Sequence, residues 1–242
     1  MMSANKKPDV AVILAAGYGK RLLPHTQDQP KPLLPVNGTP LIHRTFDALL
    51  QANIRNVIVV VGYLGNLLED YISKSFSPDF ETTFVRQDHM TGSADALALA
   101  ANHLTDGNHG DLLVLACDYL LPKFYLRELI DFHLSGDHRI SVSLRRINAD
   151  KVGESNRVDF APGHQILHIH EKPQNRPTGN QHTSASLIYV LPPQVFQFIH
   201  TAGISKRGER ELPDVVNRMI VSGMTARGLV QEALLDWEKE YR

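Results

Sequence analysis

The chain has a single cysteine, Cys117, among its 242 residues. One thiol excludes an intramolecular disulfide framework and a zinc site built mainly from cysteines. An excess of one charge is also lacking, because 25 basic residues face 26 acidic ones and leave a formal net charge of −1. No overall positive field is therefore present to attract nucleic acid or an anionic membrane. We expect no nucleic acid and no membrane as a partner.

Long hydrophobic runs are missing as well. No stretch approaches the roughly 18 apolar residues that a membrane-spanning helix requires. The apolar run at residues 10–16 is too short for a signal peptide and leads directly into Gly17, so we interpret it as a buried strand. With 43% hydrophobic and 21% charged residues, the composition is that of a globular protein. We expect a soluble, cytoplasmic protein.

Short apolar runs alternate with segments of helical period, which is typical of a mostly parallel sheet covered by helices. The run at residues 57–61 is apolar on both faces of a strand, as expected between two helix layers. We therefore predict an α/β fold with helices on both faces of the central sheet. In the first half we predict strands at Val10–Ala15, Asn56–Val61, 82–86 and 111–117, and helices around 42–50 and 126–133.

Beyond about residue 135, strands are predicted at 140–144, 157–160, 165–171 and 184–191, separated by polar turns. Residues 174–183 are predicted to form a surface loop. An apolar stripe from Leu212 to Ile220 predicts a helix that ends at Gly223. We interpret residues 1–242 as a single domain, with a nucleotide-sized α/β lobe at 1–135 and a more β-rich lobe at 136–242.

The predicted strand at Val10–Ala15 leads into a turn with two glycines, Gly17 and Gly19, followed by Lys20 and Arg21. Glycines let backbone N–H groups approach an anion where a Cβ would collide, and Arg grips phosphate oxygens in pairs. The turn lacks the third glycine of a dinucleotide-binding fingerprint and the Gly-Lys-Ser/Thr of an NTPase loop. By itself the turn is weak evidence for a phosphate site, and a plain strand-to-loop turn with two solvent-facing cations is the alternative.

A proline-rich stretch follows, with five prolines between Pro24 and Pro40. Each proline restricts its own backbone and that of the preceding residue. Lys31 stands between Pro30 and Pro32, so its ammonium is aimed before any ligand arrives. This rigidity favours a phosphate clamp over an ordinary surface loop.

Together, these segments resemble a known family. The matching residues are Leu14, Ala15, Ala16, Gly17, Gly19, Arg21 and Leu22, with Pro-Lys-Pro-Leu-Leu-Pro at 30–35. They resemble the opening motif of the nucleotidyltransferases that make NDP-sugars from an NTP and a sugar 1-phosphate. The resemblance implies a Rossmann-like sheet, an acceptor-binding lobe, Mg²⁺ and release of pyrophosphate. It implies that residues 14–17, Gly19, Lys20 and Arg21 bind the nucleotide and that Arg21 and Lys31 act in catalysis.

A second element, Gln87 followed by Gly92-Ser93-Ala94-Asp95-Ala96-Leu97, resembles the segment with which this family reads the base. The resemblance assigns base recognition to Gln87 and Gly92. An amide offers both a donor and an acceptor, which suits a pyrimidine. Ser93 also has a purely structural interpretation, which can hold together with base recognition. A serine at this point is expected to cap the helix that follows.

Asp118 follows a predicted strand, at the carboxyl end where open α/β sheets place their ligands. In the family a catalytic, metal-binding Asp stands here. Mg²⁺ keeps several waters, so one or two carboxylates with substrate phosphates suffice to hold it. Near the end of the chain, Asp236 is the counterpart of the family's second metal ligand, with a plain terminal helix as the alternative interpretation.

The segments that match the family's acceptor site depart most from the family's pattern. Glu171 and Lys172 match a Glu-Lys-Pro element whose carboxylate accepts sugar hydroxyls and whose lysine, here a catalytic candidate, meets the acceptor phosphate. Asp118, Arg157 and Tyr189 complete the implied acceptor site. Arg157 and Leu187 stand where the family has glycines. The resemblance therefore does not fix the acceptor as a hexose, and another phosphorylated alcohol remains an alternative. Glu209 and Glu211 belong to an acidic segment that opens the last long helix.

We therefore expect a nucleotidyltransferase that couples an NTP to a sugar 1-phosphate. A cytidylyltransferase for phosphocholine or another small phospho-alcohol is the alternative within the class, favoured by the missing glycines and by the Asp236 ending. A regulatory homologue without catalysis is the alternative from another class. The oligomeric state stays open, with a homo-oligomer as one option.

Overall fold

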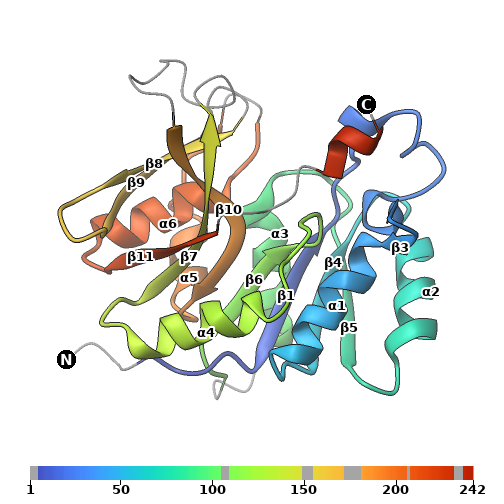
Figure 1. Cartoon of the computed structure of the whole chain (residues 1–242), viewed down its shortest axis with the longest axis horizontal. Coiled ribbons are helices and arrows are strands. Elements are labelled where there is room, and N and C mark those ends of the chain that lie inside the picture. The colour runs from blue at the N-terminus through green and yellow to red at the C-terminus, as the bar shows by residue number, and fades with distance from the viewer. Residues whose placement is uncertain are drawn as a thin grey trace.

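A computed structural model describes residues 5–104, 109–148, 155–171, 181–205, 208–231 and 237–241. Its centre is a seven-stranded sheet in the order β11-β7-β10-β6-β1-β4-β5 (Figure 1). The strands are β1 (Val10–Ala15), β4 (Asn56–Val61), β5 (Glu81–Arg86), β6 (Leu112–Ala116), β7 (Ile140–Asn148), β10 (Gln181–Leu191) and β11 (Ala226–Gln231). β10 is antiparallel to both of its neighbours, and the other pairs are parallel. The predicted mostly parallel sheet is confirmed.

Helices cover both faces of the sheet. One face carries α1 (Leu41–Gln51), α2 (Gly65–Phe76) and α4 (Tyr125–Ser135). The other carries α3 (Ser93–Ala100), α5 (Val195–Ile199) and α6 (Leu212–Val221). Along β1, Val10 and Val12 pack into one apolar core while Ala11 and Ile13 pack into the other, because successive side chains of a strand point to opposite faces. No helix in the described ranges is long and apolar enough to span a membrane.

Short elements complete the chain. Two small sheets pair β2 (Pro35–Val36) with β3 (Thr39–Pro40) and β8 (Asn156–Phe160) with β9 (Ile166–Glu171). Short 3₁₀ turns occur at η1 (Lys20–Leu22), η2 (Lys31–Leu33), η3 (Ala101–His103) and η5 (Trp237–Tyr241). In Figure 1, η5 lies beside the segment that follows β1, so the end of the chain returns to its beginning.

Several predicted boundaries shift. The strand β10 starts at Gln181, so the predicted loop 174–183 is wrong for its last three residues, which pair with β7. β7 also extends to Asn148, beyond the predicted 140–144. The helix ends are where glycines predicted them: α4 stops before Gly136, and α6 is followed by Gly223 with φ +98°.

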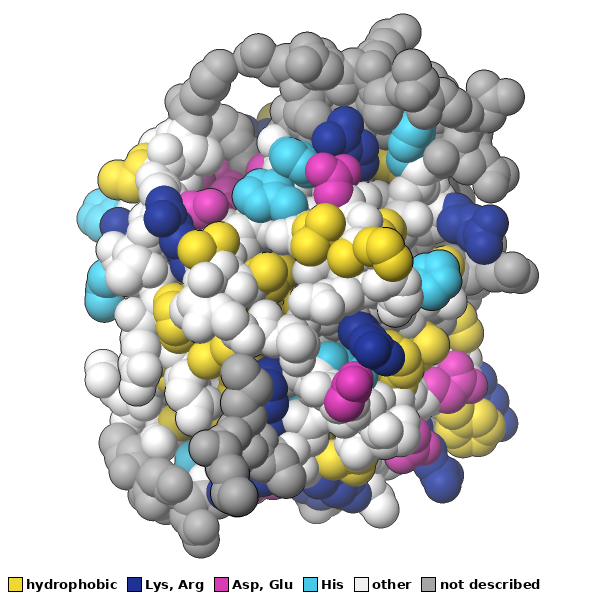
Figure 2. Space-filling model, turned by 90° about the vertical axis from the view of Figure 1, so that its left-hand side faces the viewer, with side chains coloured by type: hydrophobic (Ala, Val, Ile, Leu, Met, Phe, Trp, Pro, Cys, Tyr) yellow, Lys and Arg dark blue, Asp and Glu magenta, His cyan; other side chains and the backbone are white. Residues whose placement is uncertain are grey.

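The sheet is continuous between the two predicted lobes, because β10 pairs with β6 on one side and with β7 on the other. The β8–β9 hairpin lies on the far side of the second lobe. Figure 2 views that side and shows acidic, basic and histidine side chains of the described residues mixed across it. The division at residue 135 stays a prediction.

Candidate active site

The order of the strands creates the site. β4 and β5 extend the sheet to one side of β1, whereas β6 and the later strands extend it to the other. Ligands of open α/β sheets bind at such a reversal, outside the carboxyl ends of the strands. A cavity of about 450 Å³ lies there, lined by the end of β1, the glycine turn, Lys31 and Asp118. A second cavity of about 210 Å³ shares Leu14, Gly17, Met90 and Glu209 with the first and adds Gln87 and Gly92.

The glycine turn is fixed from two sides. Gly19 has φ +69°, and a Cβ there would lie 3.0 Å from Thr26 and 3.2 Å from the Cβ of Lys31. The Thr26 hydroxyl donates to the carbonyl of Gly19 (3.1 Å), and the N–H of Tyr63 donates to the carbonyl of Ala16 (3.2 Å). The turn therefore holds its shape before a ligand binds. Lys20 and Arg21 line the cavity from η1, and neither forms an ion pair with a described residue.

Lys31 points into this cavity. Its ammonium lies 2.7 Å from Oδ2 of Asp118 and 3.1 Å from Oε1 of Glu238, and it lies over the ring of Trp237 at 5.3 Å from the centroid. Burial alone would lower the pKa of Lys31, but the two carboxylates and their hydrogen bonds raise that pKa above its ordinary value. The ammonium is therefore charged at all physiological pH values.

Asp118 is the partner of Lys31 in the shorter ion pair. Burial disfavours its charged form, yet the charge and hydrogen bond of Lys31 keep its pKa below the ordinary value. Its Oδ1 atom is buried and has no hydrogen-bond partner among the described residues. A carboxylate oxygen of this kind suits a hard cation such as Mg²⁺. Within the described ranges, however, no three His, Cys, Asp or Glu side chains converge on one point.

Gln87 and Gly92 lie together in the second cavity, as the base-reading assignment requires. The side-chain amide of Gln87 donates to the carbonyl of Gly92 (3.3 Å), and its backbone N–H donates to Val61 (2.8 Å). Gly92 has φ +119°, and a Cβ there would lie 2.2 Å from the carbonyl oxygen of Arg210. The acidic segment before α6 thus packs directly on Gly92, and only glycine permits that approach.

Ser93 does not cap its own helix, which corrects the expectation from the sequence. Gly92 occupies the N-cap position of α3, and no side chain caps it. The Ser93 hydroxyl instead accepts from the N–H of Leu212 (2.8 Å), the first residue of α6, and donates to Glu211 (2.9 Å). It joins two helix beginnings that are distant in the sequence. Glu209 and Glu211 line the second cavity.

The proposed acceptor residues are only partly brought together. Tyr189 is fully buried, its hydroxyl has no hydrogen-bond partner among the described residues, and burial and the charges of Tyr119, Glu171 and Glu211 raise its pKa. Leu187 lines the second cavity. Lys172 and Asp236 lie outside the described residues.

Arg157 lies on the β8–β9 hairpin, away from both cavities. It forms an ion pair with Asp159 (3.1 Å), which also pairs with His170 (2.7 Å). Arg157 faces His170 across the hairpin, as Asp159 faces His168, so all four share one face. That arrangement satisfies the charges of the hairpin locally. An acceptor role for Arg157 stays a prediction.

Sequence reasoning missed Trp237 and Glu238. The Trp237 indole donates to the carbonyl of Asp118 (2.7 Å), and Glu238 lines the first cavity. Their partners precede them by more than a hundred residues, so no local pattern reveals the contact. The only available signal was the lone tryptophan in a charged C-terminal segment. Met90, which lines both cavities, was missed too.

Comparisons with known proteins agree with this geometry. The Nucleotidyl transferase family profile matches residues 10–237. Over 213 residues the chain is 28% identical to a Methanococcus maripaludis protein named Bifunctional protein GlmU, covering 88% of this chain and 47% of that protein. It is 26% identical over 227 residues to the Haloferax volcanii UTP–glucose-1-phosphate uridylyltransferase AglF, covering 89% of this chain and 85% of that protein. The chain spans about half the length of the GlmU proteins it matches, 47–52%.

Solved structures show the same fold. A UDP-glucose pyrophosphorylase complexed with UDP-glucose superimposes with a TM-score of 0.79 at 20% identity, over 92% of this chain and 90% of that one. A putative glucose-1-phosphate thymidylyltransferase from Bacillus anthracis gives 0.76 at 24% identity, over 92% and 86%. Because the family profile covers nearly the whole chain, the chain belongs to the Nucleotidyl transferase family.

Proposed function

We propose that this protein transfers a nucleotidyl group from an NTP to a sugar 1-phosphate, forming an NDP-sugar and pyrophosphate. The observation that carries the proposal is the convergence of the glycine turn, Lys31 and Asp118 on one cavity at the strand-order reversal. Family membership and the activities named for the relatives support the same reaction class.

In this reaction a phosphate oxygen of the acceptor attacks the α-phosphorus of the NTP. The bond from that phosphorus to the oxygen bridging to the β-phosphate breaks, and pyrophosphate leaves with the electron pair. The nucleophile is already an anion, so no base and no covalent enzyme intermediate are needed. Catalysis then consists of positioning and charge stabilisation. The turn at residues 17–21 and Lys31 supply N–H groups and positive charge where negative charge gathers.

Asp118 is the residue proposed to hold Mg²⁺ on the protein side, because its Oδ1 atom is buried without a hydrogen-bond partner among the described residues. A metal held there would supply positive charge to offset the negative charge of the phosphates. Asp236 remains the proposed second ligand. Asp118 is kept ionised by Lys31, so it can accept the metal without first losing a proton.

The second cavity is proposed to receive the base, and the region of Glu171 and Tyr189 the acceptor. The Gln87 amide already donates to Gly92, and its side-chain carbonyl oxygen is the group proposed to accept from the base. Leu187 occupies space in the second cavity where a family glycine would leave the backbone bare. We place the protein in the cytoplasm and leave its oligomeric state open.

The test is a pyrophosphate-release assay with Mg²⁺ across paired NTPs and acceptors. The acceptor panel includes hexose 1-phosphates, amino-sugar 1-phosphates and phosphocholine. Release that depends on both an NTP and a sugar 1-phosphate supports the proposal. Release only with phosphocholine or a similar phospho-alcohol replaces the acceptor class. No release with any pair from a folded protein rejects catalysis.

A further inference from the structure

The C-terminal turn η5 (Trp237–Tyr241) is anchored on the proline-rich segment. Trp237 is 4% exposed and packs with Leu22, Leu34, Val36 and Leu41 in a small apolar cluster separate from the two main cores. The Tyr241 hydroxyl donates to the carbonyl of Pro35, and its ring contacts His25. These contacts fix η5 as one wall of the larger cavity.

This anchoring places a carboxylate beside the cation proposed to bind phosphate. Glu238 reaches the ammonium of Lys31 at 3.1 Å, whereas Asp118 reaches it at 2.7 Å. Both carboxylates therefore contact the same ammonium. An anionic triphosphate that approaches Lys31 meets Glu238 at the same ammonium, and like charges at such distances repel.

We propose that Glu238 is an exchangeable counter-ion of Lys31. In the free protein it holds the ammonium beside Asp118, and an incoming triphosphate displaces it from that ammonium. This inference rests on the proposed function, in which Lys31 binds the phosphates. Asp118 remains on Lys31 through the shorter contact, so the lysine stays in place during the exchange.

Breaking the contact between Glu238 and Lys31 lowers the affinity of the protein for phosphates. Each triphosphate must break the Glu238 contact, and each pyrophosphate that leaves allows it to form again. Removal of the Glu238 charge should therefore tighten the binding of NTP and pyrophosphate alike. It should leave the acceptor's KM unchanged. Damage to the structure of the site would act in the opposite direction, because it weakens binding and slows turnover together.

The experiment compares the wild-type protein with Glu238→Gln and Glu238→Asp. Steady-state kinetics give KM for the NTP, KM for the acceptor, kcat and Ki for pyrophosphate. Titration calorimetry with inorganic tripolyphosphate measures the exchange without turnover. The matched control is Glu69→Gln on α2. It removes an exposed ion pair with Arg86 (3.3 Å), at the end of β5, and neither residue lines either cavity. Thermal melts establish that each variant is folded.

We expect Glu238→Gln to lower KM for the NTP, Ki for pyrophosphate and Kd for tripolyphosphate by about three- to tenfold. Loss of one partly buried ion pair changes an equilibrium constant by up to about tenfold. Glu238→Asp, one methylene shorter, should fall between wild type and Glu238→Gln. Unchanged or weaker tripolyphosphate binding by folded Glu238→Gln overturns the inference, and so does a more than tenfold loss of kcat. Tighter tripolyphosphate binding in a protein that releases no pyrophosphate with any substrate pair would instead retain the exchange and reject the proposed function.

Discussion

At the scale of single residues, Lys31 is the cation on which the proposed reaction depends most. Its ammonium is held by Asp118 and Glu238 inside the larger cavity. We expect Lys31→Ala to lower kcat by about 10²- to 10³-fold, the usual cost of losing one preorganised charge-stabilising group. Pyrophosphate release and circular dichroism together check this result.

The matched control is Lys74→Ala on α2, where the lysine is exposed and pairs only with Asp70 (3.2 Å) among the described residues. This variant should keep wild-type turnover. A folded Lys31→Ala protein with kcat within threefold of wild type would remove Lys31 from the mechanism.

The two glycines of the turn after β1 should respond differently to alanine. A Cβ at Gly17 meets no atom of the protein within 4 Å, so the folded protein accommodates the methyl group. The methyl group would instead occupy space that a ligand needs in the cavities that Gly17 lines. Gly19 has φ +69° and a crowded Cβ position, and an alanine in that conformation is strained by about 1–3 kcal/mol. We expect Gly17→Ala to raise KM for the NTP by about tenfold with an unchanged melting temperature. Gly19→Ala should lower the melting temperature.

Thermal melts and NTP titrations of both variants test the contrast. Equal melting temperatures for the two variants would show that the turn is not constrained as the structure has it. An unchanged KM for Gly17→Ala would show that the nucleotide does not approach this backbone.

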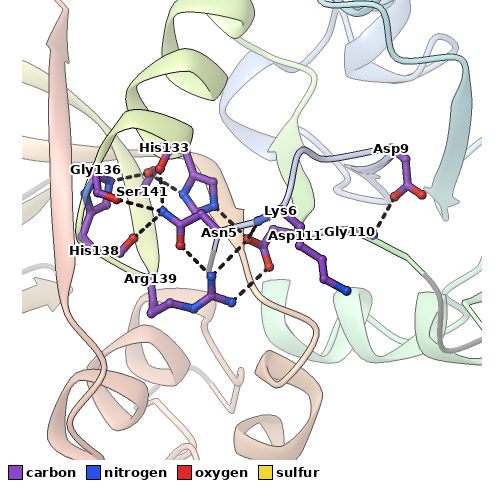
Figure 3. A network of polar contacts seen from close by, with 10 residues as sticks. All are labelled: Asn5, Lys6, Asp9, Gly110, Asp111, His133, Gly136, His138, Arg139 and Ser141. Atoms are coloured by element: carbon purple, nitrogen blue, oxygen red, sulfur yellow. Dashed lines mark hydrogen bonds and ion pairs between the residues drawn. The ribbon is translucent and has the colours of Figure 1, made fainter. Parts of the chain in front are cut away.

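At the scale of elements, a buried polar network joins the start of the chain to β6, α4 and β7 (Figure 3). Asp111 accepts from Nε2 of His133 (2.9 Å) and pairs with Arg139 (3.2 Å), and the Asn5 amide donates to the carbonyl of His138 (2.8 Å). The Ser141 hydroxyl lies 2.9 Å from Nδ1 of His133 and 2.8 Å from Nε2 of His138. The network lies at the end of the sheet opposite the site, so its effect is on stability.

His138 makes this network sensitive to acid. Burial, with the charges of His133 and Arg227, lowers the pKa of His138 from 6.5 to about 4. The unfolded chain therefore binds more protons between those values, and stability falls as the pH drops from about 6.5 toward 4. We expect a loss of about 1–3 kcal/mol in the free energy of unfolding over that range.

Urea unfolding at pH 7 and at pH 4.5 measures the loss. His138→Gln should reduce the difference between the two pH values, and His103→Gln, at an exposed position, should not. If the difference persists in full in His138→Gln, another group is responsible.

The elements most accurately predicted are those whose side chains are apolar on both faces. β1 and β4 begin and end at the predicted residues, because the runs at 10–15 and 56–61 need helix layers on both sides. The start of β10 was missed, because Gln181 and His182 are polar and only their pairing with β7 makes them strand. Such pairing is a long-range effect that local propensity does not encode.

The site shows the same division. The glycine turn and Lys31 were predictable because their backbone restraints are written in adjacent glycines and prolines. Ser93 was misassigned because the N–H it serves belongs to Leu212, and Glu238 was missed because it meets Lys31 only in the folded chain. Local chemistry pointed to the glycine turn and Lys31, which line one cavity, whereas tertiary contacts decide which other residues complete that cavity.

At the scale of the whole molecule, both ends of the family match contribute to one cavity. β1 and the glycine turn supply its floor, and η5 closes it from the C-terminal end. A ligand that binds there contacts residues from across the chain, so its binding should stabilise the fold as a whole. A ligand at 100 times its Kd stabilises a native state by about 2.7 kcal/mol, which for a chain of this size corresponds to roughly 5–10 °C in melting temperature.

We therefore expect a thermal-shift screen of NTPs with Mg²⁺ to single out a nucleotide, and we expect it to carry a pyrimidine base. The buried Gln87 amide can satisfy a donor and an acceptor on a pyrimidine edge at once. Chelation of Mg²⁺ should reduce the shift, since Asp118 and the triphosphate then repel each other without a cation between them. Gln87→Leu should abolish the preference among bases while retaining part of the shift, because the phosphates still meet the glycine turn and Lys31. A screen in which no NTP raises the melting temperature, with or without Mg²⁺, would contradict a nucleotide site at this edge of the sheet.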